Sequence, residues 1–126
     1  SGFLAPIVRS LRDPAPQGAD AVLRRSPTWI RDVAEASAFL AGRGATGAVH
    51  YSGVEGLTRH EMILQAAEVL GLPAAHIRPS SRVVPRRAVR PRDSQLATDL
   101  IRAMGFTRFT PFRDVVCSFA AGFTGR

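Results

Sequence analysis

The sequence predicts an α/β fold made of short strands and about five helices. Apolar residues recur at helical spacing in several separate stretches, and short apolar runs bounded by glycine or proline lie between them. Hydrophobic residues make up 45% of the 126 residues, which is typical of a folded core rather than of disorder. A chain of this length forms one domain or part of one.

The first third of the chain predicts a helix, a strand and a second helix. The first helix runs from Ser1 to Arg12 and carries Pro6 near its start, where a missing N–H matters least. Residues 21–23 are a strand candidate that would join a sheet. Thr28 is the expected N-cap of the second helix, which ends at Gly42. Its predicted apolar face consists of Ile30, Val33, Ala34, Ser37, Ala38, Leu40 and Ala41.

The middle third predicts a βαβ unit. Residues 47–53 form a strand between glycines, and Thr58 with Glu61 forms a capping box at the start of a helix that ends at Gly71. Residues 75–78 form the next extended piece. The crossover between the two strands is expected to be right-handed.

The last third predicts two more helices. Thr98 is the expected N-cap of a short helix over residues 99–104, and Thr110 is that of the final helix, with Pro111 at the first position. Cys117 is expected to be a small core residue. The apolar face of the final helix is predicted to be Phe112, Val115, Val116, Phe119 and Ala120.

The charge distribution predicts an anionic ligand or partner. All 17 basic residues are arginine, and the net charge is +7. Residues 79–92 form a basic loop in which Pro91 holds Arg90 in an extended conformation and so aims its guanidinium into a cleft. A solvated, flexible loop is the alternative. Nucleic acid is a weaker candidate, because few aromatic residues accompany the arginines and no known binding motif is present.

Several kinds of chemistry are excluded by residue type and spacing. Without lysine there is no Schiff-base or P-loop chemistry, and the three histidines are not spaced as a metal-binding pair. No nucleophile lies beside a base, so no catalytic residue is predicted. No apolar run reaches the length of about 18 residues that a membrane span needs, so no membrane association is predicted. The single cysteine excludes an internal disulfide and indicates either a reducing compartment or indifference to redox conditions.

Five motifs follow one another over residues 26–34, 47–53, 58–62, 90–96 and 110–113. Together they resemble the carboxy-terminal half of the dTDP-4-dehydrorhamnose reductase family of extended short-chain dehydrogenases. Within that family the motifs are most similar to the regulatory beta subunits of methionine adenosyltransferase. The resemblance runs from about Phe3 to Phe119 and implies that residues 1–126 are a single partial domain. This domain would be the substrate-binding half, lacking most of the Rossmann domain.

The resemblance also implies which residues bind ligands. In the family, an amino-terminal Rossmann domain carries the glycine fingerprint for NADP and a Tyr-x-x-x-Lys pair, and neither motif occurs in this chain. NADP is thus implied for the parent family, and no cofactor is expected to bind this chain alone. Arg90, Pro91 and Ser94 match the substrate-binding stretch, and Pro27 and Thr28 match the turn beside the cofactor. The strand at residues 21–23 would pair outside this chain.

These implications predict a non-catalytic, reductase-like module that serves as a regulatory or scaffold subunit. Its expected partner is the missing Rossmann half or the catalytic subunit of methionine adenosyltransferase. One alternative is the substrate-binding half of an NADP-dependent nucleotide-sugar reductase. Another is a basic structural subunit of a large, RNA-containing assembly. The expected location is the cytoplasm, with an organelle as the alternative.

Overall fold

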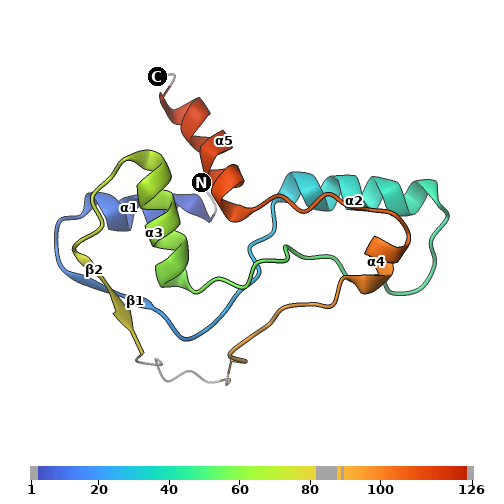
Figure 1. The fold of residues 1–126 in the computed structure, drawn as a ribbon, viewed down its shortest axis with the longest axis horizontal. Helices are drawn as coiled ribbons and strands as arrows, with labels where there is room; N and C mark the ends of the chain where they lie inside the picture. The colour runs from blue at the N-terminus through green and yellow to red at the C-terminus, as the bar shows by residue number, and fades with distance from the viewer. Residues whose placement is uncertain (1–2, 82–87, 89, 125–126) are drawn as a thin grey trace.

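The structure is a computed structural model that describes residues 3–81, 88 and 90–124. It contains the helices α1 (Leu4–Arg12), α2 (Ile30–Gly42), α3 (Arg59–Leu70), α4 (Asp99–Ala103) and α5 (Phe112–Thr124), with the strands β1 (Gln17–Asp20) and β2 (Ile77–Ser80). In Figure 1, α2 and α4 form one end of the molecule, and α1, α3 and the two strands form the other. The α/β class and the predicted number of helices are confirmed.

The larger core lies around α3, which packs against α5, α1 and both strands. Its most buried side chains include Ile7, Ile63, Ala66 and Val116. The first, third and last of the predicted helices therefore meet in this core. On α5, the predicted residues Phe112 and Val116 are buried, whereas Cys117 is exposed and does not belong to the core.

The predicted capping box at the start of α3 is confirmed. Thr58 Oγ1 accepts a hydrogen bond from the Glu61 N–H, and Glu61 Oε1 accepts one from the Thr58 N–H, both at 3.2 Å. The Thr58 backbone N–H is the main cause that lowers the pKa of the Glu61 carboxyl. Gly71 ends the helix in the left-handed conformation that glycine favours, with φ at 68°.

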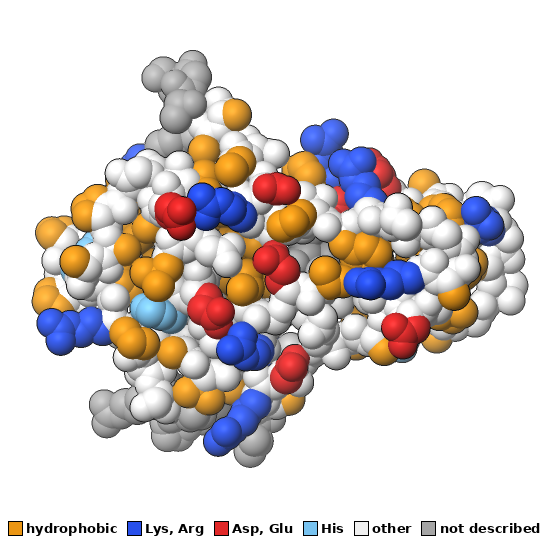
Figure 2. All heavy atoms as spheres, viewed as in Figure 1, with side chains coloured by type: hydrophobic (Ala, Val, Ile, Leu, Met, Phe, Trp, Pro, Cys, Tyr) orange, Lys and Arg blue, Asp and Glu red, His pale blue; other side chains and the backbone are white. Residues whose placement is uncertain are grey.

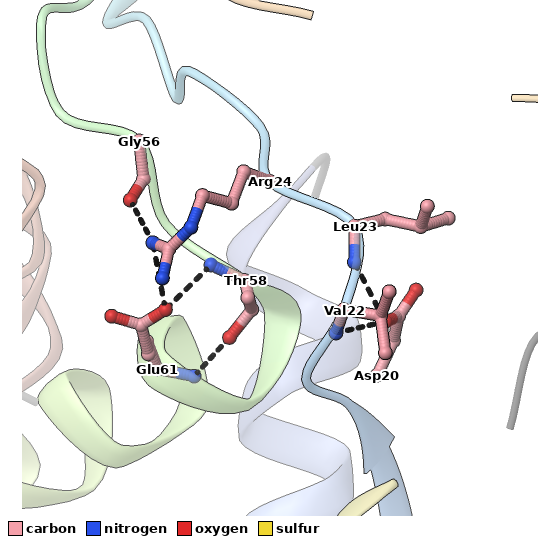
Figure 3. Close-up of polar contacts among 7 residues, drawn as sticks. All are labelled: Asp20, Val22, Leu23, Arg24, Gly56, Thr58 and Glu61. Atoms are coloured by element: carbon pink, nitrogen blue, oxygen red, sulfur yellow. Dashed lines mark hydrogen bonds and ion pairs between the residues drawn. The ribbon is translucent and has the colours of Figure 1, made fainter. Parts of the chain in front are cut away.

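The sheet differs from the prediction. β1 pairs in parallel with β2, from Gln17 opposite Ile77 to Asp20 opposite Ser80, so its partner lies within the chain rather than outside it. The strand also precedes the predicted residues 21–23. Asp20 Oδ1 accepts hydrogen bonds from the N–H groups of Val22 and Leu23 at 2.8 and 3.0 Å, and this turn ends the strand (Figure 3).

Residues 47–53 do not form the predicted strand, and the predicted βαβ unit is therefore absent. The segment runs without helix or strand from α2 towards α3 (Figure 1). Within the described part of the chain, the backbone of residues 47–51 forms no backbone hydrogen bond. A strand needs a neighbouring strand, and the described residues supply none beside this segment.

Two predicted helix caps are wrong, and a third is confirmed in position only. Trp29, not Thr28, holds the N-cap position of α2. Thr98 holds the predicted N-cap position of α4, although its side chain forms no capping hydrogen bond. The Thr110 hydroxyl turns away from α5 to Asp32, and Glu55 Oε1 instead accepts the Phe112 N–H at 2.6 Å. Sequence spacing detects local caps only, whereas the acceptor for α5 comes from a distant loop.

Much of the predicted apolar face of α2 lies on the outer side of the helix. Ile30 is 78% exposed and Val33 is 41% exposed, while the helix buries Asp32 and Ala36 on its opposite side. Ala36 packs with Ile101 and Phe106 in a smaller core that holds the α2–α4 end together. None of the helices in the described part of the chain is both long and apolar enough to span a membrane.

Candidate functional site

A cleft of about 1080 Å³ opens between the start of α1, the start of α2, α5 and the loop that precedes α4. Such a volume is at the upper end of what small-molecule sites enclose. The lining residues are Phe3, Leu4, Arg25, Ser26, Pro27, Thr28, Trp29, Ile30, Arg31, Ser52, Ser94, Leu96, Phe112, Val115, Ser118 and Phe119. Among the described residues that line the cleft, aromatic rings and hydroxyl groups predominate, and none of these residues has an acidic side chain.

One wall of the cleft is the turn at residues 26–28, which lies against the end of the 47–53 segment. Thr28 Oγ1 accepts a hydrogen bond from the Gly53 N–H and donates one to the Ser26 carbonyl, both at 2.9 Å. The structure therefore places the predicted cofactor residues Pro27 and Thr28 at the cleft. Their proposed contact with a cofactor stays a prediction.

Gly53 is required at this wall by close backbone packing. The Pro27 carbonyl oxygen occupies the space that a Cβ on residue 53 would need. We expect Gly53→Ala to lower the free energy of unfolding by about 2 kcal/mol, because the two backbone segments must separate. Urea denaturation measures this loss. Gly42→Ala is the matched control, since nothing lies within 4 Å of its added Cβ, and it is expected to be neutral or slightly stabilising. Equal stabilities of the two variants would contradict the close packing.

The predicted substrate residues separate in the structure. Ser94 lines the cleft, whereas Arg90 and Pro91 are exposed and do not line it. The Arg90–Pro91 stretch instead lies beside residues 24–25, where the Arg24 N–H donates to the Arg92 carbonyl at 2.6 Å. Half of the predicted basic loop, residues 82–87 and 89, lies outside the described residues.

Arg25 is a cleft residue that the sequence reasoning missed. It lies in the cleft lining, and its NH1 group donates to the carbonyl oxygens of Arg24 and Pro91 at 3.0 and 3.3 Å. Its backbone exchanges two hydrogen bonds with Leu57, at 2.9 and 2.8 Å. Charge density drew attention to the six arginines between Arg78 and Arg92, and the only local signal for Arg25 was its place before the 26–28 turn.

Behind the cleft, a buried carboxylate joins α2 to the segment before α5. Asp32 is only 2% exposed and accepts hydrogen bonds from Arg108 Nε at 3.1 Å, from the Thr110 N–H at 2.7 Å and from Thr110 Oγ1 at 2.9 Å. Arg108 also pairs with Glu35 at 3.0 Å. All three hydrogen bonds come from groups of the segment before α5, so Asp32 acts as a structural link.

The single tyrosine of the chain is unsuited to proton transfer. Burial, followed by the nearby Asp32 carboxylate, raises the pKa of Tyr51 to about 12, and its hydroxyl donates to the Arg108 carbonyl. Such a phenol stays protonated at neutral pH. The ring packs against Phe106 and Phe109. Among the described residues, no group of three or more side chains could hold a metal ion.

Charges outside the cleft are largely mixed. Figure 2 shows arginine and acidic side chains interspersed over the visible face rather than gathered by sign. Arg24 pairs with Glu61 at 3.2 Å and Arg113 pairs with Glu68 at 3.0 Å. Exposed pairs of this kind contribute little to stability, but they leave less unpaired positive charge on the surface.

Comparison with protein families and curated proteins gives consistent matches. The family model of the RmlD substrate binding domain matches residues 2–124. Methionine adenosyltransferase 2 subunit beta of Pongo abelii is 35% identical over 95 residues, which cover 71% of this chain and 28% of the relative. The protein of the same name from Danio rerio is 30% identical over 100 residues, covering 74% and 31%. The chain thus spans less than a third of these relatives' length.

Solved structures share the fold. A dTDP-4-dehydrorhamnose reductase from Yersinia enterocolitica superposes with a TM-score of 0.77 at 15% identity, covering 98% of this chain and 44% of that one. The Bordetella bronchiseptica enzyme WbmH, solved in complex with NAD+, superposes with a TM-score of 0.71 at 22% identity, covering 99% and 40%. At these identities the likeness establishes the fold alone.

Proposed function

The chain belongs to the family of RmlD substrate-binding domains, as its motifs predicted, and from this premise we propose that it is a reductase-like regulatory or scaffold module. The observation that carries the proposal is its 35% identity to proteins named methionine adenosyltransferase 2 subunit beta. The proposed partners are a cofactor-carrying Rossmann lobe and a methionine adenosyltransferase catalytic subunit.

The surface of the molecule supports a protein partner. The outward side of α2, formed by Ile30, Val33, Ala34, Ala38 and Ala41, is apolar and exposed, and we call it the α2 face. Beside α2 in sequence, the 47–51 segment leaves its backbone groups without backbone partners among the described residues. Exposed apolar helix faces and unpaired extended backbone are both features of surfaces that other chains or lobes cover.

This chain alone could not carry out the family's hydride transfer. The family's hydride transfer uses a lysine, and this sequence contains none. The glycine fingerprint that binds NADP is also not in the sequence, so Pro27 and Thr28 would provide only part of a cofactor site. NADP, bound mainly by the second lobe, would supply the hydride chemistry.

The partner surface is tested by a charged substitution at Val33. We expect Val33→Asp to weaken association with the catalytic subunit, or with a Rossmann lobe, about tenfold or more, because it buries an unpaired carboxylate. Surface plasmon resonance with either immobilised partner measures the change. Leu64→Asp on α3 is the matched control, because Leu64 is 40% exposed against 41% for Val33. Failure of the unmodified chain to bind either partner would refute the proposal.

A second candidate is the substrate-binding half of an NADP-dependent nucleotide-sugar reductase. The observation that favours it is that Thr28 and Ser94, which the family motifs assign to cofactor and substrate, line the same cleft. Under this alternative, the chain combined with a Rossmann lobe would oxidise NADPH in the presence of a 4-dehydro nucleotide sugar. The regulatory module would bind its partner without such turnover.

A further inference from the structure

We propose that the end of the molecule formed by α2 and α4 docks an acidic segment of a partner protein, whose carboxylates are recognised by Arg43 and Arg102. We call these two residues the arginine pair. The inference rests on the proposed function for the existence of a protein partner, and it deepens that function by naming the chemistry of the partner's surface. Neither residue lines the cleft or belongs to the α2 face.

The arginine pair lies where two helices end beside each other. Arg43 caps the C-terminus of α2, and Arg102 lies in the last turn of α4. These helices form one end of the molecule (Figure 1). Arg43 NH2 lies 3.8 Å from the position that a Cβ on Gly105 would take, and the Gly105 N–H donates to the Arg102 carbonyl at 2.9 Å. The Arg43 side chain therefore reaches the turn that follows Arg102.

Aromatic rings hold both side chains in place. The Arg43 guanidinium carbon lies 4.4 Å from the centroid of the Phe39 ring. The Arg102 guanidinium carbon lies 4.6 Å from the centroid of the Phe109 ring. Phe106 joins the two rings, with its centroid 5.3 Å from that of Phe39 and 6.1 Å from that of Phe109. Both arginines thus lie on one aromatic cluster, which restricts them before a partner binds and so lowers the entropy cost of binding.

The N–H groups of the arginine pair are available to an anion. Both residues are exposed, and neither guanidinium forms a salt bridge or a side-chain hydrogen bond with the described residues. By contrast, Arg24, Arg108 and Arg113 are each paired with a carboxylate. Stacking on a ring uses the flat face of a guanidinium and leaves its in-plane N–H donors, which can bind a carboxylate through two parallel hydrogen bonds.

The surroundings favour the carboxylates of a protein over the phosphates of a nucleic acid. The arginine pair covers the rings beneath it, and Phe106 is only 7% exposed, so these rings offer little surface on which a base could stack. Nucleic acid is usually bound through several phosphates at once, whereas the charges on the visible face of this molecule are mixed (Figure 2).

An apolar surface begins beside the arginine pair. Ala38 and Ala41 belong to the α2 face, are exposed, and lie near the end of the helix that Arg43 caps. Protein interfaces are enriched in arginine and place polar groups around an apolar centre, and complementary charges fix the orientation of the partner. The arginine pair therefore suits the charged border of a surface centred on the α2 face, and the segment that opposes it carries acidic side chains.

Short peptides labelled with a neutral coumarin test the arginine pair without a partner protein. The probe alternates glutamate with serine, and its neutral analogue has glutamine in place of glutamate. We expect the double variant of Arg43→Gln and Arg102→Gln to bind the acidic peptide about tenfold more weakly, because two groups that form charged hydrogen bonds are lost. The affinity for the neutral peptide is expected to stay unchanged. Fluorescence anisotropy measures both affinities.

The double variant of Arg24→Gln and Arg113→Gln is the matched control. It removes the same charge from two exposed arginines that are already paired with glutamates of α3, and it is expected to leave the affinity for the acidic peptide nearly unchanged. The proposal is overturned if the two double variants weaken the acidic peptide alike, or if loss of the arginine pair changes neither peptide or both equally. It is also overturned if an oligothymidylate of equal charge binds more tightly than the peptide and depends more on the arginine pair.

Nuclear magnetic resonance of the unmodified chain gives a test that does not rely on the folding of a variant. Adding the acidic peptide is expected to shift the Nε–H signals of the arginine pair more than those of Arg24 and Arg113, and equal or absent shifts would overturn the proposal. The outcome is separable from the partner test. If Val33→Asp weakens partner binding while the peptide shifts no signal of the arginine pair, the proposed function stands and this inference fails.

Discussion

Replacing Asp32 by alanine is expected to lower the free energy of unfolding by about 3 kcal/mol, among the largest effects of a single substitution in this chain. Asp32 is 2% exposed and accepts three hydrogen bonds, two of them from Thr110. Its removal leaves the Thr110 N–H and hydroxyl without their acceptor. Arg108 is 45% exposed and can return to water, which keeps the loss below that of a fully buried ion pair.

Urea denaturation of the variant measures this loss. Asp32→Asn retains the shape of the side chain and one acceptor oxygen, so it is expected to lose less stability than Asp32→Ala. Glu35→Ala is the exposed control, because Glu35 also pairs with Arg108 but is 46% exposed, and its loss is expected to stay within about 1 kcal/mol. Equal losses for Asp32→Ala and Glu35→Ala would show that burial of the carboxylate is unimportant.

The second large effect is expected at Ile63, in the middle of α3. Ile63→Ala should lower the free energy of unfolding by about 3 kcal/mol, because it removes buried methyl groups and leaves a cavity where α3 meets its neighbours. Ile63 is 2% exposed and belongs to the larger core. The neighbouring Leu64 is 40% exposed and provides the control, since Leu64→Ala makes no comparable cavity.

Urea denaturation of the Ile63→Ala and Leu64→Ala variants tests this prediction. A loss at Leu64 that equals the loss at Ile63 would contradict the assignment of the core to the inner face of α3. The two midpoints should differ while the dependence on urea concentration stays the same, because neither substitution changes the surface exposed on unfolding.

Local signals in the sequence predicted the fold best where the structure is local. The capping box of Thr58 and Glu61 and the glycine after α3 involve residues within one turn of each other, and both predictions are confirmed. Apolar periodicity likewise located the buried face of α5, including Phe112 and Val116.

Predictions that needed a distant partner were less successful. Periodicity identified an apolar side of α2, but it could not show that the side lies outward with Val33 exposed. The 47–53 strand failed because a strand is defined by its neighbour, and none lies within the described residues. The first strand was predicted too late in the sequence, at residues 21–23. The hydrogen bonds of the Asp20 side chain end β1 before this run of apolar residues begins.

At the cleft, the residues selected from the sequence are only partly those that line the cavity in the structure. The family motifs pointed to Pro27, Thr28 and Ser94, and the structure brings these three residues to one cavity, although their contacts with ligands stay a prediction. Charge density pointed to Arg90, which the structure places outside the cavity, and it overlooked Arg25. A single arginine beside a turn carries no distinctive pattern, so only its position in space separates it from the others.

The parallel pairing of β1 with β2 has a consequence for how stability is distributed. Gln17 opposes Ile77, so the chain containing both α2 and α3 must close into a long loop before the first rung of the ladder forms. The entropy lost in that closure is not recovered by two strands of four residues each. The ladder therefore persists because the packed helices have already brought its ends together, and it is a product of helix packing rather than its cause.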